Sequence, residues 1–349
     1  MERYIGLDVH RDSCTVGVVG PSGKRLKSFV VETNGSALVE VIRSVPSRRH
    51  ICLEEGTQSA WLHELLSPHA EEVVVVVPEK RHGSSDKRDA WTRAEELRTG
   101  AIVTRVYKAP KHLAALKNAV RGHLMAVRDV VRVKNRLKAI WRSRGIRSTV
   151  GVYDPDTRGR WVSRLPQAYR ALAEGLGKQL DVLEPLRAEA ECSLLKEAKT
   201  HPTVRIISTA PGMGRIRSAQ VVAVVATPQR FRTRQQFWSY CGLGIVTRSS
   251  ADWVYVNGQK ERREVRQTRG LTRKRNPLLK QVFKGAATTV ITQLADHPLH
   301  EDYQRMIDSG IKPNLARITL ARRISAIVLS MWKHQEVYDP SRHIVAGQQ

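Results

Sequence analysis

The sequence predicts an α/β domain over residues 1–107, a helical segment over 108–200 and a mainly α region over 201–349. Three observations predict this division. Short β-branched runs alternate with helical stretches in the first part, apolar residues recur at helical spacing after Pro110, and a glycine-rich turn opens a third set of helices. A chain of 349 residues, with 41% apolar and 26% charged residues, is long enough for two or three domains with their own cores.

The first domain is predicted to begin with three antiparallel strands, at Tyr4–Val9, Cys14–Val19 and Lys24–Val31. Each is rich in β-branched residues, and turn signals such as Gly20-Pro21-Ser22-Gly23 join them. Helices and strands then alternate. We expect a helix at Ser36–Arg43, a strand at His50–Leu53, a helix at Trp61–Leu66, a valine strand ending at Pro78 and a helix over Asp86–Thr99.

This order of elements is that of a ribonuclease-H-like, or RuvC-like, domain, in which helices cover a sheet. The five valines Val73 to Val77 predict a strand that is buried on both faces. The fold class predicted for residues 1–107 is therefore α/β.

The helical segment is predicted to begin with one long helix that extends from Leu113 to Trp141, because apolar residues recur there at helical spacing. Residues 111–147 hold 11 Lys+Arg and one acid, Asp129, so the polar face of this helix suits a nucleic-acid backbone. A second amphipathic helix, interrupted near Pro185, completes a helical hairpin or coiled coil that could bring subunits together. The apolar pattern by itself says only that something packs there.

The net charge of +26 predicts attraction to a polyanion, and the phosphates of nucleic acid fit best. Residues 1–107 contain 15 Lys+Arg and 15 Asp+Glu, whereas the remainder holds 44 basic and 18 acidic residues. A merely basic, solvated surface is the weaker alternative for an excess so unevenly distributed. The sequence thus separates a neutral segment with candidate catalytic acids from a basic segment that binds nucleic acid.

The four cysteines show no paired spacing. Cys14 and Cys52 lie inside strand-like runs, which favours small buried side chains over disulfides or zinc ligands and fits a reducing compartment. The amino terminus leads into a strand without a charged leader and an apolar signal core, and the longest apolar block is too short to span a bilayer. We therefore expect a cytoplasmic protein with no membrane partner.

Four acids in the first ninety residues, Asp8, Glu54, Asp86 and Asp89, predict a metal site. Asp8 and Glu54 each close an apolar strand, so both would leave neighbouring strands at the same edge of a sheet. Asp86 and Asp89 lie three apart, on one face of a helix. Crowded carboxylates need a cation, here Mg²⁺, which prefers hard oxygen ligands and can activate a phosphodiester. Taken singly, each acid could instead be a turn residue, a solvated strand end or a helix cap.

The third region begins near His201 and contains the turn Pro211-Gly212-Met213-Gly214. This turn resembles the hairpin of helix-hairpin-helix elements, in which glycines let backbone amides approach a phosphate. A plain turn between helices is the alternative, and the nearby Arg215 and Arg217 favour phosphate contact. A segment at Trp238–Leu243, a polar loop and two further helices are expected to follow.

A serine pair in the polar loop, Ser249 and Ser250, would by itself predict a turn. Residues 259–275 contain eight Lys+Arg, which could clamp phosphates or stabilise a pentacovalent phosphorus that a serine attacks. The positions predicted to bind nucleic acid are Arg121, Arg128, Arg132, Lys134, Arg136 and Lys138 on the long helix, Arg215 after the glycine turn, and Arg262, Arg263, Arg266 and Arg269 downstream.

Six motifs carry a resemblance over essentially the whole chain. They are Tyr-Ile-Gly-Leu-Asp at 4–8, Ile-Cys-Leu-Glu at 51–54, Ser-Asp-Lys-Arg-Asp-Ala at 85–90, the Pro-Gly-Met-Gly turn, Phe-Trp-Ser-Tyr-Cys-Gly-Leu at 237–243 and Tyr-Asp-Pro-Ser-Arg-His at 338–343. In this order they resemble an insertion-sequence-110 family transposase. That family joins a DEDD, RuvC-like domain through a coiled coil to a carboxy-terminal transposase domain that supplies a catalytic serine.

The resemblance implies a composite site in which Mg²⁺ is held at the scissile phosphate by the acids Asp8, Glu54, Asp86 and Asp89. A serine attacks that phosphate and forms a transient phosphoserine link to DNA. Counting from Gly242-Leu243 places this serine at Ser250, with Ser249 as the adjacent alternative. The following Ala251-Asp252-Trp253 departs from the Gly- and Ser-rich loop of the family.

The resemblance also implies donor and target DNA as substrates, a structured non-coding bridge RNA that pairs with both, and dimers that join into a tetramer. We therefore predict a recombinase that excises and inserts a mobile DNA element. The first alternative is a RuvC-type structure-specific nuclease whose acids activate water. The second is a non-catalytic nucleic-acid-binding protein.

Overall fold

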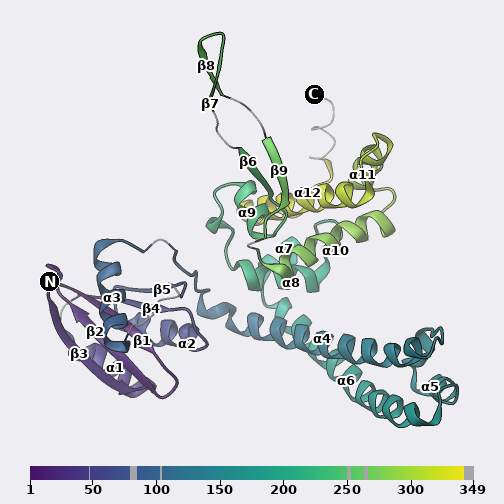
Figure 1. The fold of residues 1–349 in the computed structure, drawn as a ribbon, viewed down its shortest axis with the longest axis horizontal. Coiled ribbons are helices and arrows are strands. Elements are labelled where there is room, and N and C mark those ends of the chain that lie inside the picture. The colour runs from purple at the N-terminus through teal and green to yellow at the C-terminus, as the bar shows by residue number, and fades with distance from the viewer. Residues whose placement is uncertain are drawn as a thin grey trace. The chain divides into compact units, whose positions relative to one another are not determined.

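The computed structural model of the chain divides into two compact units, Met1–Lys111 and His112–Gln349 (Figure 1). The first unit is mixed α/β and the second is mostly helical, which confirms the predicted fold class at this level. A further boundary at residue 200 stays a prediction. The structure describes residues 1–46, 48–78, 85–102, 104–249, 253–262, 266–273 and 275–341.

The first unit is built on one five-stranded sheet with helices. Its main elements are β1 Glu2–Val9, β2 Ser13–Val19, β3 Arg25–Glu32, α1 Gly35–Ser44, β4 Arg48–Glu54, α2 Ser59–Leu66, β5 Glu72–Val76 and α3 Asp86–Thr99. The strand order is β3-β2-β1-β4-β5. The first three strands are antiparallel neighbours, whereas β4 lies parallel to β1 and β5 parallel to β4. Every strand and helix predicted before residue 100 is present.

Helices cover both faces of this sheet. Side chains alternate along a strand, and Ile5 and Leu7 of β1 lie in one apolar core with Leu38 of α1 and Leu62 of α2. Gly6, between them, faces α3 on the opposite side. The sheet therefore separates the main core of the unit from the face that carries α3.

The valine strand β5 contributes to both sides of the sheet. Val75 belongs to the core with α1 and α2, whereas Val74 and Val76 pack with Leu97 of α3. Burial on both faces is therefore confirmed for these valines, although Val77 is exposed.

A pair of glycines brings α3 against the sheet. Gly6 of β1 and Gly17 of β2 lie opposite each other. A Cβ atom added to Gly6 would lie 1.8 Å from the carbonyl oxygen of Ala90, and one added to Gly17 would lie 2.7 Å from Cδ1 of Trp91. Any side chain at these positions would push the helix away. The contact fixes where the first turn of α3 lies, one turn before Ala90.

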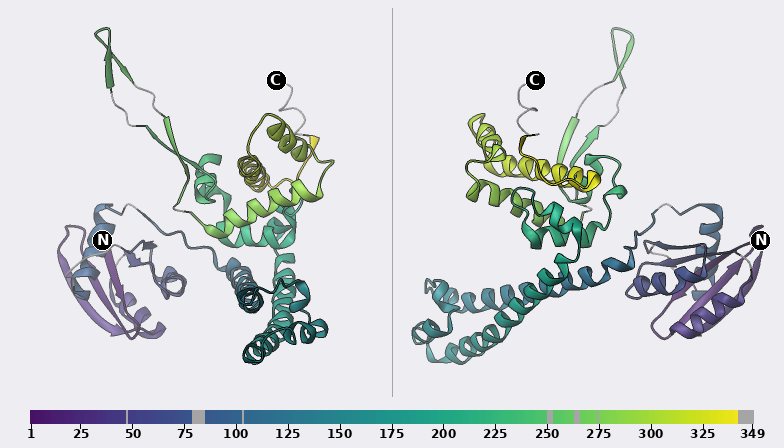
Figure 2. Two further views of the ribbon diagram at one scale, coloured as in Figure 1. Left: turned by 45° about the vertical axis from the view of Figure 1, so that its right-hand side comes forward. Right: turned by 180° about the vertical axis from the view of Figure 1, so that it is seen from behind.

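The second unit begins with two long helices that run antiparallel (Figure 2). The helices of this part are α4 Ala114–Ser143, α5 Pro155–Val162 and α6 Gln167–Lys199. α4 and α6 pack through an apolar core that includes Leu137, Trp141 and Leu180. The predicted interruption near Pro185 is wrong, because α6 continues through it. Pro185 is exposed, so water can satisfy the carbonyl that its missing N–H leaves without a donor.

Shorter helices and two small sheets complete the second unit. The elements are α7 Pro202–Ile207, α8 Gly214–Val225, α9 Arg234–Tyr240, β6 Ile245–Ser249, β7 Trp253–Val256, β8 Gln259–Arg262, β9 Arg266–Leu271, α10 Pro277–Gln293, α11 Pro298–Asp308 and α12 Pro313–His334. β6 pairs with β9 and β7 with β8, both antiparallel, and both pairs extend away from the helices (Figures 1 and 2).

The strands after residue 244 correct the prediction of a polar loop, and three rather than two helices follow them in the described residues. The sequence holds a hairpin signal at Asn257-Gly258. Both residues have positive φ, 53° and 80°, which is the backbone conformation of a tight two-residue turn between antiparallel strands.

Candidate functional site

Asp8 and Glu54 leave neighbouring strands at one edge of the sheet. β1 and β4 are parallel, with Leu7 opposite Leu53, so Asp8 and Glu54 follow side by side in the register. Asp8 lies two residues after Gly6 and thus on the same side of the sheet, the side that α3 covers. Both carboxylates therefore start from backbone positions that face α3.

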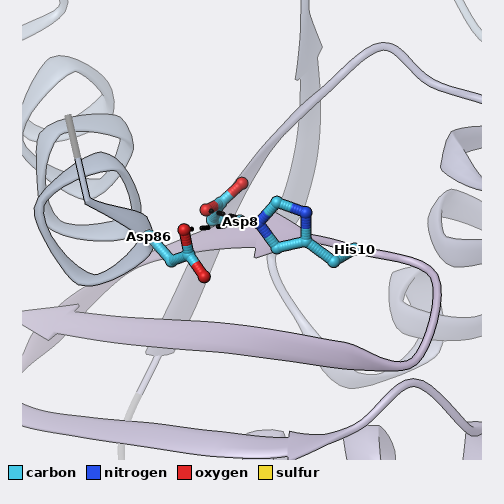
Figure 3. Close-up of side chains that lie close together, drawn as sticks. All are labelled: Asp8, His10 and Asp86. Carbon is cyan, nitrogen blue, oxygen red and sulfur yellow. Dashed lines mark ion pairs between the residues drawn. The ribbon is translucent and has the colours of Figure 1, made fainter. Parts of the chain in front are cut away.

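Three side chains, Asp8, His10 and Asp86, meet just beyond the end of β1 (Figure 3). His10 Nε2 lies 3.3 Å from Asp8 Oδ2 and 3.5 Å from Asp86 Oδ1. One ligand atom from each residue lies within 4.8 Å of the others. Carboxylate oxygens and an imidazole nitrogen are ligands of divalent metals. We call this group the Asp8 cluster, and it is the candidate metal site.

The Asp8 carboxyl is in an unfavourable place for a negative charge. Burial raises its pKa above the usual range, and the charges of Asp86 and Asp89 raise that pKa further, while His10 lowers it. Asp89 is therefore close enough to repel Asp8, although it is not one of the three clustered ligands. A cation among these oxygens would relieve the repulsion and favour the charged carboxylates.

The first turn of α3 offers a simpler explanation for two of the acids. Asp86 and Asp89 both lie in that turn, where the helix dipole favours negative charge. A capping role does not explain why Asp86 also approaches Asp8, because that approach brings two like charges together. The convergence of separate elements, rather than the helix position, is the feature that indicates a metal.

Glu54 lies outside the Asp8 cluster, in an ion pair with a buried arginine. Arg93 of α3 is 4% exposed and donates from Nε to Glu54 Oε1 at 3.0 Å. Its Nη2 donates to the same oxygen, and its Nη1 donates to Glu96. Both bonds from Arg93 to Glu54 end on Oε1, and in the described part of the chain no hydrogen bond reaches Oε2.

Sequence reasoning did not single out His10 or Arg93, although spacing holds a signal for each. Arg93 follows Asp89 by four residues and Asp86 by seven, which puts all three on one face of α3. His10 follows Asp8 by two residues, the period of a strand. The structure adds both residues to the acids as candidates for the site.

The exposed side of α4 carries five of the six basic residues that are predicted to bind nucleic acid on this helix. Lys134 differs from them, because it forms an ion pair with another helix, to Glu184 of α6, and its ammonium lies 5.5 Å from the ring centre of Tyr153. Lys134 therefore stabilises the helix pair. Arg132 pairs only within α4, with Asp129 at 3.1 Å. The exposed residues are Arg121, Arg128, Arg132, Arg136 and Lys138.

The predicted glycine turn lies between α7 and α8, with positive φ at Gly212 and Gly214. Arg215 is exposed. Arg217 instead donates from Nη1 to the Gly212 carbonyl. The same atom donates to Thr289 Oγ1 of α10 at 3.0 Å, so Arg217 connects the turn to α10 and stabilises it. Of the two arginines, Arg215 is the one that remains available to a phosphate.

The predicted nucleophile Ser250 lies outside the described residues, as does Arg263. Ser249 is the last residue of β6. The other predicted phosphate contacts are in strands, with Arg262 in β8 and Arg266 and Arg269 in β9.

Comparison with known proteins places the chain in a family. A DEDD transposase model of the IS110 type, described as "Transposase", matches residues 5–143, and one described as "Transposase IS116/IS110/IS902 family" matches residues 204–304. The chain belongs to this transposase family. It is also similar to the "Insertion element IS116 uncharacterized 44.8 kDa protein" of Streptomyces clavuligerus, with 20% identity over 400 residues that cover 97% of the chain and 96% of the relative.

Family membership determines the class of reaction. Transposases cleave and rejoin DNA, so this transposase acts on DNA and is an enzyme of mobile-element transposition. The RuvC-type nuclease considered as an alternative is not favoured. No helix in the described part of the chain is long and apolar enough to cross a membrane.

Replacing Arg93 with Gln should lower the free energy of unfolding by about 3 kcal/mol, because it leaves two partly buried carboxylates without their cation. Urea denaturation of the full chain measures this loss. The control is Arg98→Gln, which removes a more exposed arginine paired with Glu95 on the same helix and should cost less than about 1 kcal/mol. Equal losses in both variants would show that Arg93 does not neutralise Glu54.

Proposed function

We propose that this transposase excises and inserts a mobile DNA element by using a magnesium site in its first unit and a serine nucleophile in its second. The observation that carries the proposal is the meeting of Asp8, from the end of β1, with Asp86, from the start of α3. Two acids from separate elements share a site where their charges repel. Such an arrangement is stabilised by a cation and suits phosphodiester chemistry.

We further infer that the first unit has a ribonuclease-H-like fold. The strand order β3-β2-β1-β4-β5 supports this, with an antiparallel meander followed by two parallel strands. So does the position of the acids, at the ends of the two central parallel strands and on the helix that covers them. A solved structure with a different strand order would overturn the inference.

The donor set fits Mg²⁺, which prefers hard oxygen ligands. Asp8, Asp86 and Asp89 supply carboxylates, and Glu54 supplies its Oε2 atom while Arg93 holds the carboxylate in place. When bound, the ion would polarise the scissile phosphodiester and offset charge on the attacking and leaving oxygens. The chain's own part is to hold these acids in place against their mutual repulsion.

Ser250 is proposed as the nucleophile. Its hydroxyl gives up a proton and its Oγ forms a bond to phosphorus as the bond from phosphorus to a deoxyribose oxygen breaks, and the oxygen that leaves takes up a proton. A deoxyribose hydroxyl then attacks the phosphoserine and releases the serine, so rejoining needs no external energy source. The arginines of β8 and β9 follow the serine in the chain and are suited to stabilise the charge on the pentacovalent phosphorus.

Asp8→Asn should abolish binding of Mg²⁺ and strand cleavage, because the variant loses a charged ligand while keeping its volume. Loss of several kcal/mol of transition-state stabilisation corresponds to a rate reduction on the order of 10³-fold or more. Titration calorimetry measures Mg²⁺ binding, and cleavage of a DNA that carries the element end measures activity. Glu54→Gln should also lose cleavage.

Asp12→Asn is the matched control, because Asp12 follows the same strand, is 89% exposed and pairs with Arg11. It should bind Mg²⁺ and cleave DNA as the unchanged protein does. RNA binding should survive in all three variants. Full recombination by Asp8→Asn would refute the metal assignment.

Ser250→Ala should prevent a covalent protein–DNA adduct on a nicked DNA substrate, because no other atom at that position can attack the phosphorus. Denaturing electrophoresis with labelled DNA detects the adduct. Ser249→Ala is the control and should retain it. The reverse result would move the nucleophile to Ser249, and an unchanged protein that cleaves DNA without any adduct would exclude the serine mechanism.

A structured bridge RNA is the proposed guide, with sequence recognition delegated to base pairing. The exposed face of α4 supports RNA or DNA binding. Arg121, Arg128, Arg132 and Arg136 follow one another by seven, four and four residues, so they lie along one side of the helix. A row of this kind contacts a phosphate backbone without reading its sequence.

Self-association is proposed through the side of α6 that faces away from α4. Leu172, Val182 and Leu186 are 58%, 63% and 49% exposed. With Gly175 and Gln179 they recur at alternating steps of three and four residues, the spacing by which two helices pack in a coiled coil. A second copy of the chain would remove this apolar surface from water.

Native mass spectrometry of the full chain tests both proposed partners, the bridge RNA and further copies of the chain. The expected species contain RNA and two or four copies of the 39.3 kDa protein. Replacing Val182 and Leu186 with Glu should leave one copy, because charges would then lie in the helix interface. A single copy without RNA from the unchanged protein would contradict both proposals.

A further inference from the structure

Three basic side chains lie close together at the start of α10. They are Arg275, which lies two residues before the helix, and Lys280 and Lys284, which are one turn apart on it. Among the residues that the structure describes, no carboxylate forms an ion pair with any of them. We call these three residues the α10 row.

Tertiary contacts hold the beginning of the α10 row at the base of the β6–β9 pair. The Asn276 N–H donates to the Tyr240 carbonyl at 2.9 Å, and the Thr272 N–H donates to the Gly244 carbonyl at 2.9 Å. The stem of Arg275 crosses Gly242, where an added Cβ would lie 2.0 Å from Arg275 Cδ. The charge of Arg275 is therefore fixed next to the strands that lead to the proposed serine.

The electrostatics of the α10 row are unfavourable without an anion. Like charges four residues apart on a helix repel, and cations near a helix amino terminus oppose its dipole. Burial lowers the pKa of Lys280, and the charges of Arg275 and Lys284 lower it further. Residues 201–295 hold 17 Lys+Arg and three acids, so this part of the chain has few carboxylates to supply.

The α10 row continues toward the glycine turn of the same unit. A Cβ added to Gly212 would lie 2.3 Å from the Ala286 carbonyl, so the turn rests on α10 just after Lys284. Arg217 passes within 3.3 Å of a Cβ added to Gly285. The helix α10, which carries Lys280 and Lys284, thus connects the base of the β6–β9 pair with the glycine turn.

We propose that Arg275, Lys280 and Lys284 bind the phosphate backbone of the DNA strand that the serine attacks. The inference rests on the proposed function, because it takes its choice of DNA from the position of the row beside the serine strands. Lys280 and Lys284 are half-buried and Arg275 is exposed, with its stem held against Gly242. Cations that are already in place lose little freedom on binding a backbone, and their contacts carry no sequence preference. The α10 row would hold the backbone of this DNA strand against the start of α10, next to the scissile phosphate.

The test is a double variant, Lys280→Gln with Lys284→Gln, in the full chain. Fluorescence anisotropy with a labelled DNA duplex is measured over a series of salt concentrations. Loss of two phosphate contacts should lower the steepness of log affinity against log salt by about 1.8 and weaken binding by roughly tens of fold at 0.1 M salt. Lys196→Gln with Lys199→Gln, which removes two exposed lysines from the end of α6, is the control and should change neither quantity.

A conservative pair, Lys280→Arg with Lys284→Arg, separates charge from packing and should keep DNA affinity. An unchanged salt dependence in the glutamine variant would overturn the proposal. Loss of RNA affinity with intact DNA affinity would overturn it too, because the row would then serve RNA. The adduct assay on Ser250 judges the serine mechanism independently, so its failure and the failure of the α10 row remain distinguishable.

Discussion

The candidate metal site depends on one steric constraint, the close contact of α3 with the β1–β2 pair. Gly6 and Gly17 lie opposite each other, and neither position has room for a Cβ atom beneath the helix backbone. This contact determines the height and the register of α3 over the sheet. Asp86, one turn before the contact on the helix, consequently reaches the region that Asp8 enters two residues after Gly6 on the strand.

Charge within the first unit is balanced locally but not at the Asp8 cluster. Arg93 is buried against the sheet and satisfies Glu54 and Glu96 together. The oxygens of Asp8 and Asp86 share the imidazole of His10 instead. A buried guanidinium thus neutralises Glu54 and Glu96, while the repulsion that remains between Asp8 and Asp86 is the property that a metal ion can use.

In the second unit, some basic residues form contacts inside the protein and others face solvent. Lys134 and Arg217 are used inside the protein, one between long helices and the other beneath the glycine turn. Arg322 likewise donates to the Leu243 carbonyl at 2.6 Å, at the base of β6. Exposed or half-buried basic residues remain along α4 and at the start of α10, and a polyanion on these surfaces lowers the free energy.

The sequence alone determined the elements of the first unit, because β-branched runs, turns and helical periodicity are local patterns. It also located the acids at strand ends and showed the separation of a neutral segment from a basic one. Tertiary structure decided which partners these side chains have. Glu54 with Arg93 and Asp8 with Asp86 are pairs distant in sequence, and Lys134 gives no local sign that it is turned toward α6. Such contacts arise from how elements pack, and a pattern within one element holds no information about its neighbour.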